Sequence, residues 1–407
     1  MNVGFITSCR PDASGSVVLA DNTYNTIWQV TGTDAARVIY SVVGFVGGIS
    51  LPRTSAPLFS INAVWGDSAS NLYLTNPINH ILYKITNDTG QVSVFAGTYI
   101  GAFNSDNRMA TLAALNAPRG VSGDVTGNIY ISDYQNHRIR RVSTSNVITT
   151  VAGTASGCAA SFNFNNVVAS STSLCSPGVL AMHPNSNLLY FVNYQNSIAV
   201  LNIQAGTMSF VSGSTASNIV DTTSLNAARY KTISALYYSV NGLYSGESVG
   251  NRVRSIDIGG NFVMTVAGTS SATATAADGQ TGTDTKLDSI VAICGFIGNK
   301  LYFIEDNVYK MRYLDYFSYL VRNFLGIDTV GIGEENVQVM GSLASRLMGC
   351  HYNPTTDTMY IAEYINATNR GIAIQARIRK IQYGAVITTR QQTQCILQSI
   401  LMLLTGE

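Results

Sequence analysis

The chain repeats one pattern of residues about every 57 positions. Its clearest copy reads Leu115-Asn-Ala-Pro-Arg-Gly-Val121, Gly127-Asn-Ile-Tyr-Ile-Ser-Asp133, Asn136-His-Arg-Ile-Arg-Arg-Val142 and Val151-Ala-Gly-Thr154. Each copy has a polar residue at the end of its second apolar run, which we call the anchor. The anchors are Asp21, Asn76, Asp133, Asn193, Glu247, Glu305 and Glu363. Self-similarity at a fixed period is the signature of repeat architecture, so one unit and its copy number define the fold.

Each unit reads as four short strands. The second and third strands form a hairpin in which polar and apolar residues alternate, as in residues 71–85. The fourth strand ends on a glycine, as in Phe95-Ala-Gly-Thr98. Glycine has no Cβ, so it allows the backbone to turn sharply out of an outer strand. The last unit lacks this closing glycine.

Four-stranded antiparallel units of this length cannot bury both faces alone, so they stack radially as the blades of a β-propeller. The sequence therefore predicts an all-β protein, and the seven anchors predict seven blades. Their approximate bounds are 1–50, 51–105, 106–160, 161–220, 221–275, 276–335 and 336–394. A short apolar tail, 395–407, follows the last blade. If the least regular unit, the sixth, were merged or displaced, the ring would have six blades instead.

The repeated sequence motifs resemble NHL repeats, a family named for an Asn-His-Leu-type motif. That motif stands here as Asn79-His-Ile81 and Asn136-His-Arg138, and the third unit matches over its whole length. NHL propellers most often have six blades, which keeps the six-bladed alternative open. The resemblance implies one of three kinds of function: a lyase or hydrolase, an RNA-binding domain, or a binding propeller of an extracellular protein or sensor.

Composition favours a protein exported from the cell. Hydrophobic residues make up 46% of the chain and charged residues only 12%, so the surface is dominated by neutral hydroxyl and amide side chains. No apolar run is long enough to cross a membrane. The first residues do not form a signal peptide. We therefore expect an extracellular or cell-surface module that belongs to a larger chain or assembly.

Six cysteines allow disulfides in such a protein. Cys158 and Cys175 bracket the connection between the third and fourth units, where a disulfide would staple a long loop. Cys9, Cys294 and Cys350 precede their anchors by similar distances, which places all three on innermost strands. There we expect buried free thiols. Cys395 follows the last blade, and a closed ring would bring it near Cys9, which makes a Cys9–Cys395 clasp an alternative.

The four histidines argue against an enzyme. A metal site needs several histidine or carboxylate side chains at one point. The repeat instead places His80 and His137 on one face of the ring, and His183 and His351 on the other. His80 and His137 are interpreted as structural residues of the motif. With no nucleophile elbow and no phosphate-binding loop either, we expect no catalytic residues, no metal and no cofactor.

The anchors themselves permit two interpretations. Each side chain can accept hydrogen bonds from the backbone N–H groups of the adjacent turn, as Asp and Asn do in turns. Alternatively, Glu247, Glu305 and Glu363 lie in consecutive units and would form an acidic rim on one face of the ring.

Charge also argues against nucleic acid as a partner. The net charge is only +1, and phosphate binding requires clustered Lys and Arg. The local basic runs, Arg138-Ile-Arg-Arg141 and Arg377-Ile-Arg-Lys380, lie on third strands, where Arg alternates with Ile as the motif requires. We expect a non-enzymatic propeller that binds a protein partner or further copies of itself, with recognition of a ligand or glycan as the alternative.

The contacts with a partner are expected from the loops 97–114, 154–174, 268–286 and 326–342 and from the apolar tail. Asn87 and Asn366 match the glycosylation sequon on predicted hairpin turns, so both are candidates for modification. Chance alone is sufficient to explain the two sequons.

Overall fold

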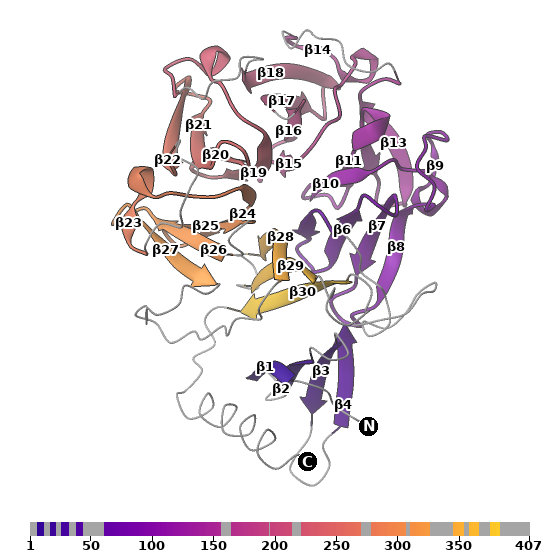
Figure 1. Cartoon of the computed structure of the whole chain (residues 1–407). Helices are drawn as coiled ribbons and strands as arrows, with labels where there is room; N and C mark the ends of the chain where they lie inside the picture. Colours follow the sequence, from indigo (N-terminus) through magenta and orange to yellow (C-terminus); the bar gives the residue numbers. More distant parts are fainter. Residues whose placement is uncertain are drawn as a thin grey trace.

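The computed structural model describes residues 6–11, 17–21, 26–31, 38–43, 61–155, 164–194, 196–213, 221–269, 278–306, 310–325, 345–353, 358–365 and 375–382. These residues form antiparallel sheets and a few short 3₁₀ turns, and Figure 1 shows the sheets arranged radially around a centre. The predicted all-β β-propeller is confirmed.

Five sheets are complete blades, which we number 1 to 5. Blade 1 consists of β5 (Val64–Gly66), β6 (Leu72–Asn76), β7 (Ile81–Ile85) and β8 (Val92–Gly97). Blade 2 consists of β10 (Pro118–Gly123), β11 (Ile129–Asp133), β12 (Arg138–Val142) and β13 (Val147–Ala152), with β9 (Arg108–Met109) at its outer edge. Blade 3 consists of β15 (Leu180–Met182), β16 (Leu188–Asn193), β17 (Ser197–Asn202) and β18 (Thr207–Gly213), with β14 (Val167–Val168) outermost.

Blade 4 consists of β19 (Ile233–Ser239), β20 (Gly242–Glu247), β21 (Arg252–Asp257) and β22 (Phe262–Ala267). Blade 5 consists of β24 (Ile290–Ile297), β25 (Lys300–Glu305), β26 (Lys310–Asp315) and β27 (Leu320–Leu325), with β23 (Gln280–Thr281) outermost. The C-terminal sheet consists of β28 (Ser345–Asn353), β29 (Thr358–Ile365) and β30 (Gln375–Gln382). The N-terminal sheet consists of β1 (Ile6–Pro11), β2 (Val17–Asp21), β3 (Thr26–Thr31) and β4 (Val38–Val43).

The blade count differs from the prediction. The described residues form five complete blades, so the expectation of seven is wrong, as is the alternative of six. The three-stranded C-terminal sheet lies between blades 5 and 1, because its inner strand β28 packs against both β24 and β5. The N-terminal sheet pairs only within itself, and Figure 1 shows it outside the ring.

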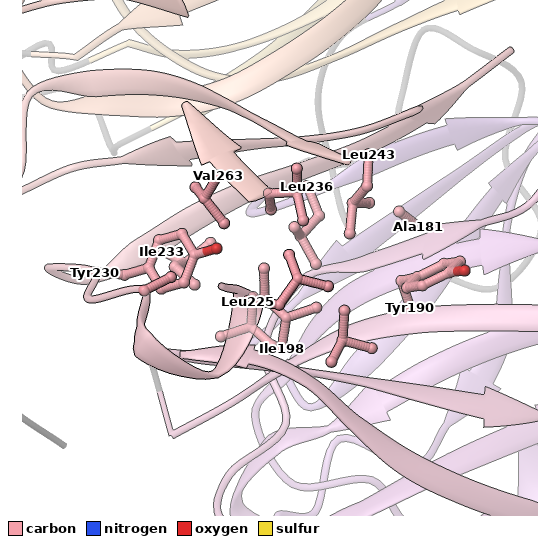
Figure 2. Close-up of a cluster of buried hydrophobic side chains, with 13 residues drawn as sticks. Ala181, Tyr190, Ile198, Leu225, Tyr230, Ile233, Leu236, Leu243 and Val263 are labelled. Atoms are coloured by element: carbon pink, nitrogen blue, oxygen red, sulfur yellow. The ribbon is translucent and has the colours of Figure 1, made fainter. Parts of the chain in front are cut away.

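A buried tyrosine of the second strand joins consecutive blades. The residue three positions before the anchor is Tyr73, Tyr130, Tyr190, Tyr244, Tyr302 or Tyr360 in six of the seven units. Figure 2 shows one such contact, in which Tyr190 of blade 3 lies in one apolar cluster with Ile233 and Leu236 of blade 4. The first unit has Val18 at this position.

The same contact closes the ring. Tyr360 of the C-terminal sheet belongs to the cluster of Ile61, Val64 and Leu74 of blade 1. Burial of a side chain of this size stabilises a fold by about 2 to 3 kcal/mol. The apolar clusters therefore lie between blades, and each blade depends on its successor for a covered face.

The closing glycines act as the sequence predicted. Gly97, Gly153, Gly213 and Gly268 all have positive φ, between 95° and 120°. A Cβ on Gly153 would stand 2.2 Å from the carbonyl oxygen of His137, and the other three meet equivalent oxygens at 2.2 to 2.4 Å. Any other residue would force the outer strand away from the third strand of its own blade.

The connecting segments cover the outer edges of the blades. In blades 2, 3 and 5 the incoming chain pairs with the outermost strand as β9, β14 and β23, and in blade 4 Thr222 bridges to Val263 at the same place. Each short pairing leads into a 3₁₀ turn, at Ala110–Leu112, Ala169–Ser171, Leu225–Ala227 and Gly282–Asp284. An exposed sheet edge would pair with other chains, and this arrangement protects it.

A disulfide joins the inner strands β24 and β28. Cys294 and Cys350 are linked across 56 residues, with their Cα atoms 4.9 Å apart. The expectation of free thiols is therefore wrong for these two residues, because neighbouring units place them side by side at the centre. Cys175 is also disulfide-bonded. Its expected partner Cys158 lies outside the described residues, as does Cys395, so the Cys158–Cys175 and Cys9–Cys395 pairings stay predictions.

Candidate binding surfaces

The anchor side chains are buried and hold the chain that enters each blade. Oδ1 of Asp133 accepts a hydrogen bond from the backbone N–H of Asn116 at 2.6 Å. Asn193, Glu247 and Glu305 accept the same bond from the residue 16 to 18 positions earlier, at 2.7 to 3.1 Å. The hydrogen-bonding interpretation of the anchors is therefore correct for these four, although the donors precede the first strand and do not belong to the adjacent turn.

Three of the acidic anchors are paired with a buried arginine seven residues later. Nη1 of Arg140 lies 3.2 Å from Asp133, Nη1 of Arg254 lies 3.5 Å from Glu247, and Nη1 of Arg312 lies 3.2 Å from Glu305. A second carboxylate from the connecting segment completes two of these pairs: Asp106 lies 2.9 Å from Arg140, and Asp221 lies 2.8 Å from Arg254.

The acidic rim predicted from Glu247 and Glu305 does not form, because both side chains are buried and ion-paired. The Glu363 side chain lies outside the described residues. Burial raises the pKa of Glu247 and of Glu305, while the neighbouring arginines lower it. Burial likewise raises the pKa of Asp133 to about 6, against hydrogen bonds from Asn136 and the Asn116 backbone and the charge of Arg140. These carboxylates are engaged inside the blades and are not accessible to a cation from solvent.

Two of the three arginines in the basic run on β12 are also buried. Arg140 is fully buried, and Arg138 is largely buried with its guanidinium carbon 3.9 Å from the centre of the Phe103 ring. Nη1 of Arg138 donates to the carbonyl oxygen of Asn136 at 2.8 Å. Neither side chain is available to bind phosphate. The side chains of the second run, Arg377-Ile-Arg-Lys380, lie outside the described residues.

The histidines of the motif connect blades. Nδ1 of His80 accepts a hydrogen bond from the Ala117 backbone N–H at 3.0 Å, and Nδ1 of His137 accepts one from the Ser176 N–H at 3.1 Å. In blade 4 the equivalent residue is Asn251, whose Oδ1 accepts from the Ser289 N–H at 2.9 Å. His80, His137 and Asn251 all have a φ of 54° to 58°. The structural interpretation of these histidines is supported by this shared geometry.

The other two histidines lie among aromatic rings. The His183 ring centre is 4.4 Å from that of Tyr238, and the His351 ring centre is 6.1 Å from that of Trp65. His351 lies within β28. Burial lowers its pKa to about 4, so the ring is neutral at physiological pH. Within the described ranges, no three His, Cys, Asp or Glu side chains converge as a metal site requires.

The turns between first and second strands differ among the blades. In blades 1 and 2 this turn has five residues, 67–71 and 124–128, and begins with an aspartate. Asp124 accepts hydrogen bonds from Asn128 at 2.8 Å and from the hydroxyl of Tyr130 at 2.9 Å. Asp67 occupies the same position beside Tyr73. The longer turn therefore closes over the tyrosine of its own blade.

Blades 4 and 5 have two-residue turns instead. Ser239 pairs directly with Gly242, and Ile297 with Lys300, which leaves only residues 240–241 and 298–299 in the turns. No aspartate caps Tyr244 there. A hollow of about 630 Å³ lies over this tyrosine, which we call the aromatic groove. It is lined by Asn241, Tyr244, Phe296, Gly298, Asn299, Tyr316 and Phe317.

The rings of the aromatic groove pack at an angle to one another. The Phe296 ring centre is 5.4 Å from the centres of both Tyr244 and Tyr316. Phe317 follows on the turn between β26 and β27 and is 86% exposed. Its backbone N–H donates to Oδ1 of Asp315 at 2.8 Å, and Nδ2 of Asn299 donates to the same oxygen at 2.6 Å. The turn that presents Phe317 is thus fixed by hydrogen bonds.

Sequence reasoning missed the aromatic groove, although a signal was present. The second-strand tyrosine recurs in every blade, but Asp67 and Asp124 have no counterpart before Tyr244. The doublet Tyr316-Phe317 also has no equivalent in the corresponding turns of the other blades, which carry Thr86, Ser143, Ile203 or Ile258 after the third strand.

A second surface lies on the segment between β8 and β10, within the loop 97–114. Five large apolar side chains are exposed there, and the four most exposed are Tyr99 (58%), Ile100 (65%), Met109 (46%) and Leu112 (61%). We call them the loop surface.

Hydrogen bonds hold the segment that carries the loop surface. Nδ2 of Asn104 and Nη1 of Arg108 donate to the Leu112 carbonyl oxygen at 3.0 and 3.1 Å, and Oδ1 of Asn104 accepts from the Ala114 N–H at 2.9 Å. The part of the segment that carries Met109 and Leu112 is therefore held by its own hydrogen bonds.

The remaining sequence predictions fall in part outside the described residues. Asn87 lies exposed in the turn between β7 and β8, where a glycan has room. Asn366, the tail 395–407 and the loop 326–342 are not described. In the part of the chain that is described, no helix has the length and apolar character needed to span a bilayer.

Comparison with known proteins agrees with the repeat and the ring. Residues 102–289 match the family model of the teneurin NHL domain. Together with the radial sheets, this match identifies the class as a β-propeller built from NHL repeats. Residues 102–289 therefore consist of NHL repeats within a β-propeller. No curated protein sequence shows significant similarity to this chain.

Solved structures share the fold at low sequence identity. An auxiliary nutrient binding protein from Bacteroides thetaiotaomicron superposes with a TM-score of 0.55 and 13% identity, covering 89% of this chain and 85% of that one. One from Bacteroides ovatus has a TM-score of 0.55 and 11% identity, with coverages of 90% and 86%. Virginiamycin B lyase from Staphylococcus aureus has a TM-score of 0.48 and 13% identity, with coverages of 88% and 92%. These likenesses concern the fold alone.

Proposed function

We propose that this chain is a non-enzymatic propeller that binds a protein partner, or further copies of itself, through the loop surface. The observation that carries the proposal is the set of exposed apolar side chains on an ordered segment. Single exposed apolar residues are common on protein surfaces, but several on one rigid segment mark an interaction site. Binding to a preformed surface also avoids the entropy cost of ordering a loop.

The use of the polar residues supports a binding role over catalysis. Inside the blades, the carboxylates of Asp133, Glu247 and Glu305 pair with arginines and accept hydrogen bonds from backbone N–H groups. His80 and His137 are occupied by the backbone of the next blade. These five groups thus have structural partners within the ring.

An oxidising location is part of the proposal. The Cys294–Cys350 disulfide and the low content of charged residues are both typical of extracellular proteins. We propose that the propeller works outside the cell, as a module of a larger assembly.

Hydroxyl-radical footprinting tests the interaction, because it reports the solvent access of individual side chains. Tyr99 and Met109 are expected to be protected from oxidation in the native assembly and oxidised in the isolated chain. Met264, on the outer strand of blade 4, is 50% exposed and serves as the matched control. Equal oxidation of Met109 in both samples would contradict the proposal. Lactone hydrolysis by the purified protein would contradict its non-enzymatic part.

A further inference from the structure

The aromatic groove is a local departure from the repeat. Blades 1 and 2 cover the corresponding tyrosine with a five-residue turn, and they also have glycine at the position of Phe296, which is Gly66 and Gly123. The aromatic ring of the preceding sheet packs there: a Cβ on Gly123 would stand 2.3 Å from the Trp65 ring, and one on Gly66 would stand 2.8 Å from the His351 ring. In blades 1 and 2 the aromatic residues therefore fill the space between blades.

In blades 4 and 5 the same space is left open. The shorter turns remove the covering residues, while Phe296, Tyr316 and Phe317 add rings around the hollow. An apolar ring that is 86% exposed gains nothing from folding, since the hydrophobic effect stabilises only the area removed from water. The exposed Phe317 thus makes no contribution to the core that would explain its position.

The lining has a particular chemical character. It combines aromatic rings with the amides of Asn241 and Asn299, and it includes no charged side chain. Beside the lining, Oδ1 of Asp315 accepts hydrogen bonds from Asn299 and the Phe317 backbone, and Nζ of Lys300 lies 4.8 Å from the centre of the Tyr313 ring. The lining itself offers no cation to an anion such as a nucleotide and no carboxylate to a cationic ligand.

We propose that the aromatic groove binds a neutral pyranose sugar. The C–H face of a pyranose ring is apolar and flat, so it stacks on an aromatic ring, whose face carries partial negative charge. The hydroxyl groups at its edge both donate and accept hydrogen bonds, as an amide does. Phe317 supplies the stacking face, Asn241 the exposed amide, and Tyr244, Phe296 and Tyr316 the base of the groove.

The size of the hollow agrees with a small ligand. Its volume of about 630 Å³ lies within the range of 300 to 1,000 Å³ typical of small-molecule sites. The turns that form its rim are fixed, since two-residue hairpins have few conformations and the β26–β27 turn is capped by Asp315. A preformed site of this kind loses little conformational entropy on binding.

Saturation-transfer NMR with a panel of neutral disaccharides, namely maltose, cellobiose, lactose and mannobiose, tests the proposal. At least one sugar is expected to show saturation transfer with a Kd of about 1 mM or below. Phe317→Ala should weaken that binding about tenfold, and Asn241→Ala several-fold, because each removes a stacking or hydrogen-bonding group. Both residues are exposed, so the variants should melt at the temperature of the wild type.

Tyr99→Ala is the matched control, because it removes an exposed aromatic ring from the loop surface and should leave sugar binding unchanged. The proposal is overturned if no sugar of the panel binds, or if Phe317→Ala binds as tightly as the wild type. A proline-rich peptide that binds through Phe317, with no sugar binding, would assign the groove to a protein ligand and also overturn it. Failure here does not affect the loop surface, which footprinting tests separately.

Discussion

Removal of the Cys294–Cys350 disulfide is expected to destabilise the propeller by about 4 kcal/mol. The cross-link joins residues 56 positions apart, and a loop of that length loses about 14 cal/mol/K of entropy in the unfolded chain. At 25 °C this corresponds to about 4 kcal/mol. Both sulfurs lie in the apolar cluster between blade 5 and the C-terminal sheet, so alanine at the two positions introduces no polar group.

Urea denaturation of the Cys294→Ala/Cys350→Ala variant against the oxidised wild type measures this difference. Circular dichroism and tyrosine fluorescence should give coincident transitions if the two-state treatment applies. The single variant Cys294→Ala is the control for a free thiol left at Cys350. A loss of less than about 1 kcal/mol would refute the reasoning, because it would mean that the unfolded chain is not constrained by the cross-link. Limited proteolysis of the double variant should begin in β28 to β30, where the restraint is lost.

Three further predictions concern the effect of substitutions at buried positions on the stability of the propeller. Arg312→Met should cost about 3 to 5 kcal/mol of unfolding free energy because it leaves Glu305 charged and buried, and adding Glu305→Gln should recover part of that loss in a double-mutant cycle measured by denaturation. The His351 pKa of about 4 in the folded protein lies below the unfolded value of 6.5. At pH values between 4 and 6.5 the imidazole therefore binds a proton in the unfolded state but not in the folded state. Stability should therefore fall by up to about 3 kcal/mol as pH drops from 6.5 to 4, and a flatter pH profile is expected for His351→Phe; equal profiles would contradict this. Gly123→Ala should cost about 1 to 3 kcal/mol because its Cβ meets the Trp65 ring, whereas Gly259→Ala, whose Cβ has 3.6 Å of space, should change the melting temperature little.

The repeat made most of the ring predictable. The closing glycines follow from local geometry, because a positive φ with a carbonyl oxygen 2.2 Å from the Cβ position excludes other residues. The blade count was not predictable in the same way, since a hairpin pattern shows that strands pair but not which sheets join a ring. Only the first unit departs from the six recurring tyrosines, with Val18 at this position.

The buried ion pairs left a signal in the sequence as well. The acidic anchors of blades 2, 4 and 5 are followed seven residues later by Arg140, Arg254 and Arg312, whereas the Asn anchors of blades 1 and 3 are followed by Tyr83 and Val200. Alternation along a strand gives the side of the sheet but not whether that side faces solvent or a neighbouring blade. For that reason the sequence pattern is equally consistent with Glu247 and Glu305 forming an exposed acidic rim on one face of the ring. The aromatic groove depends on the absence of a turn, which a pattern of recurring residues does not reveal.

Because Tyr360 packs against blade 1, blade 1 cannot be fully covered until the C-terminal sheet has been synthesised. Ile61 and Val64 are synthesised early, but Tyr360, whose side chain covers them, is synthesised about 300 residues later. At roughly 5 to 20 residues per second, this apolar face of blade 1 stays uncovered for about 15 to 60 s on the ribosome. Blades 2 to 5 wait much less, because each is covered as soon as its successor emerges. The first blade is therefore the part of this ring that most needs protection from aggregation while the chain is being made.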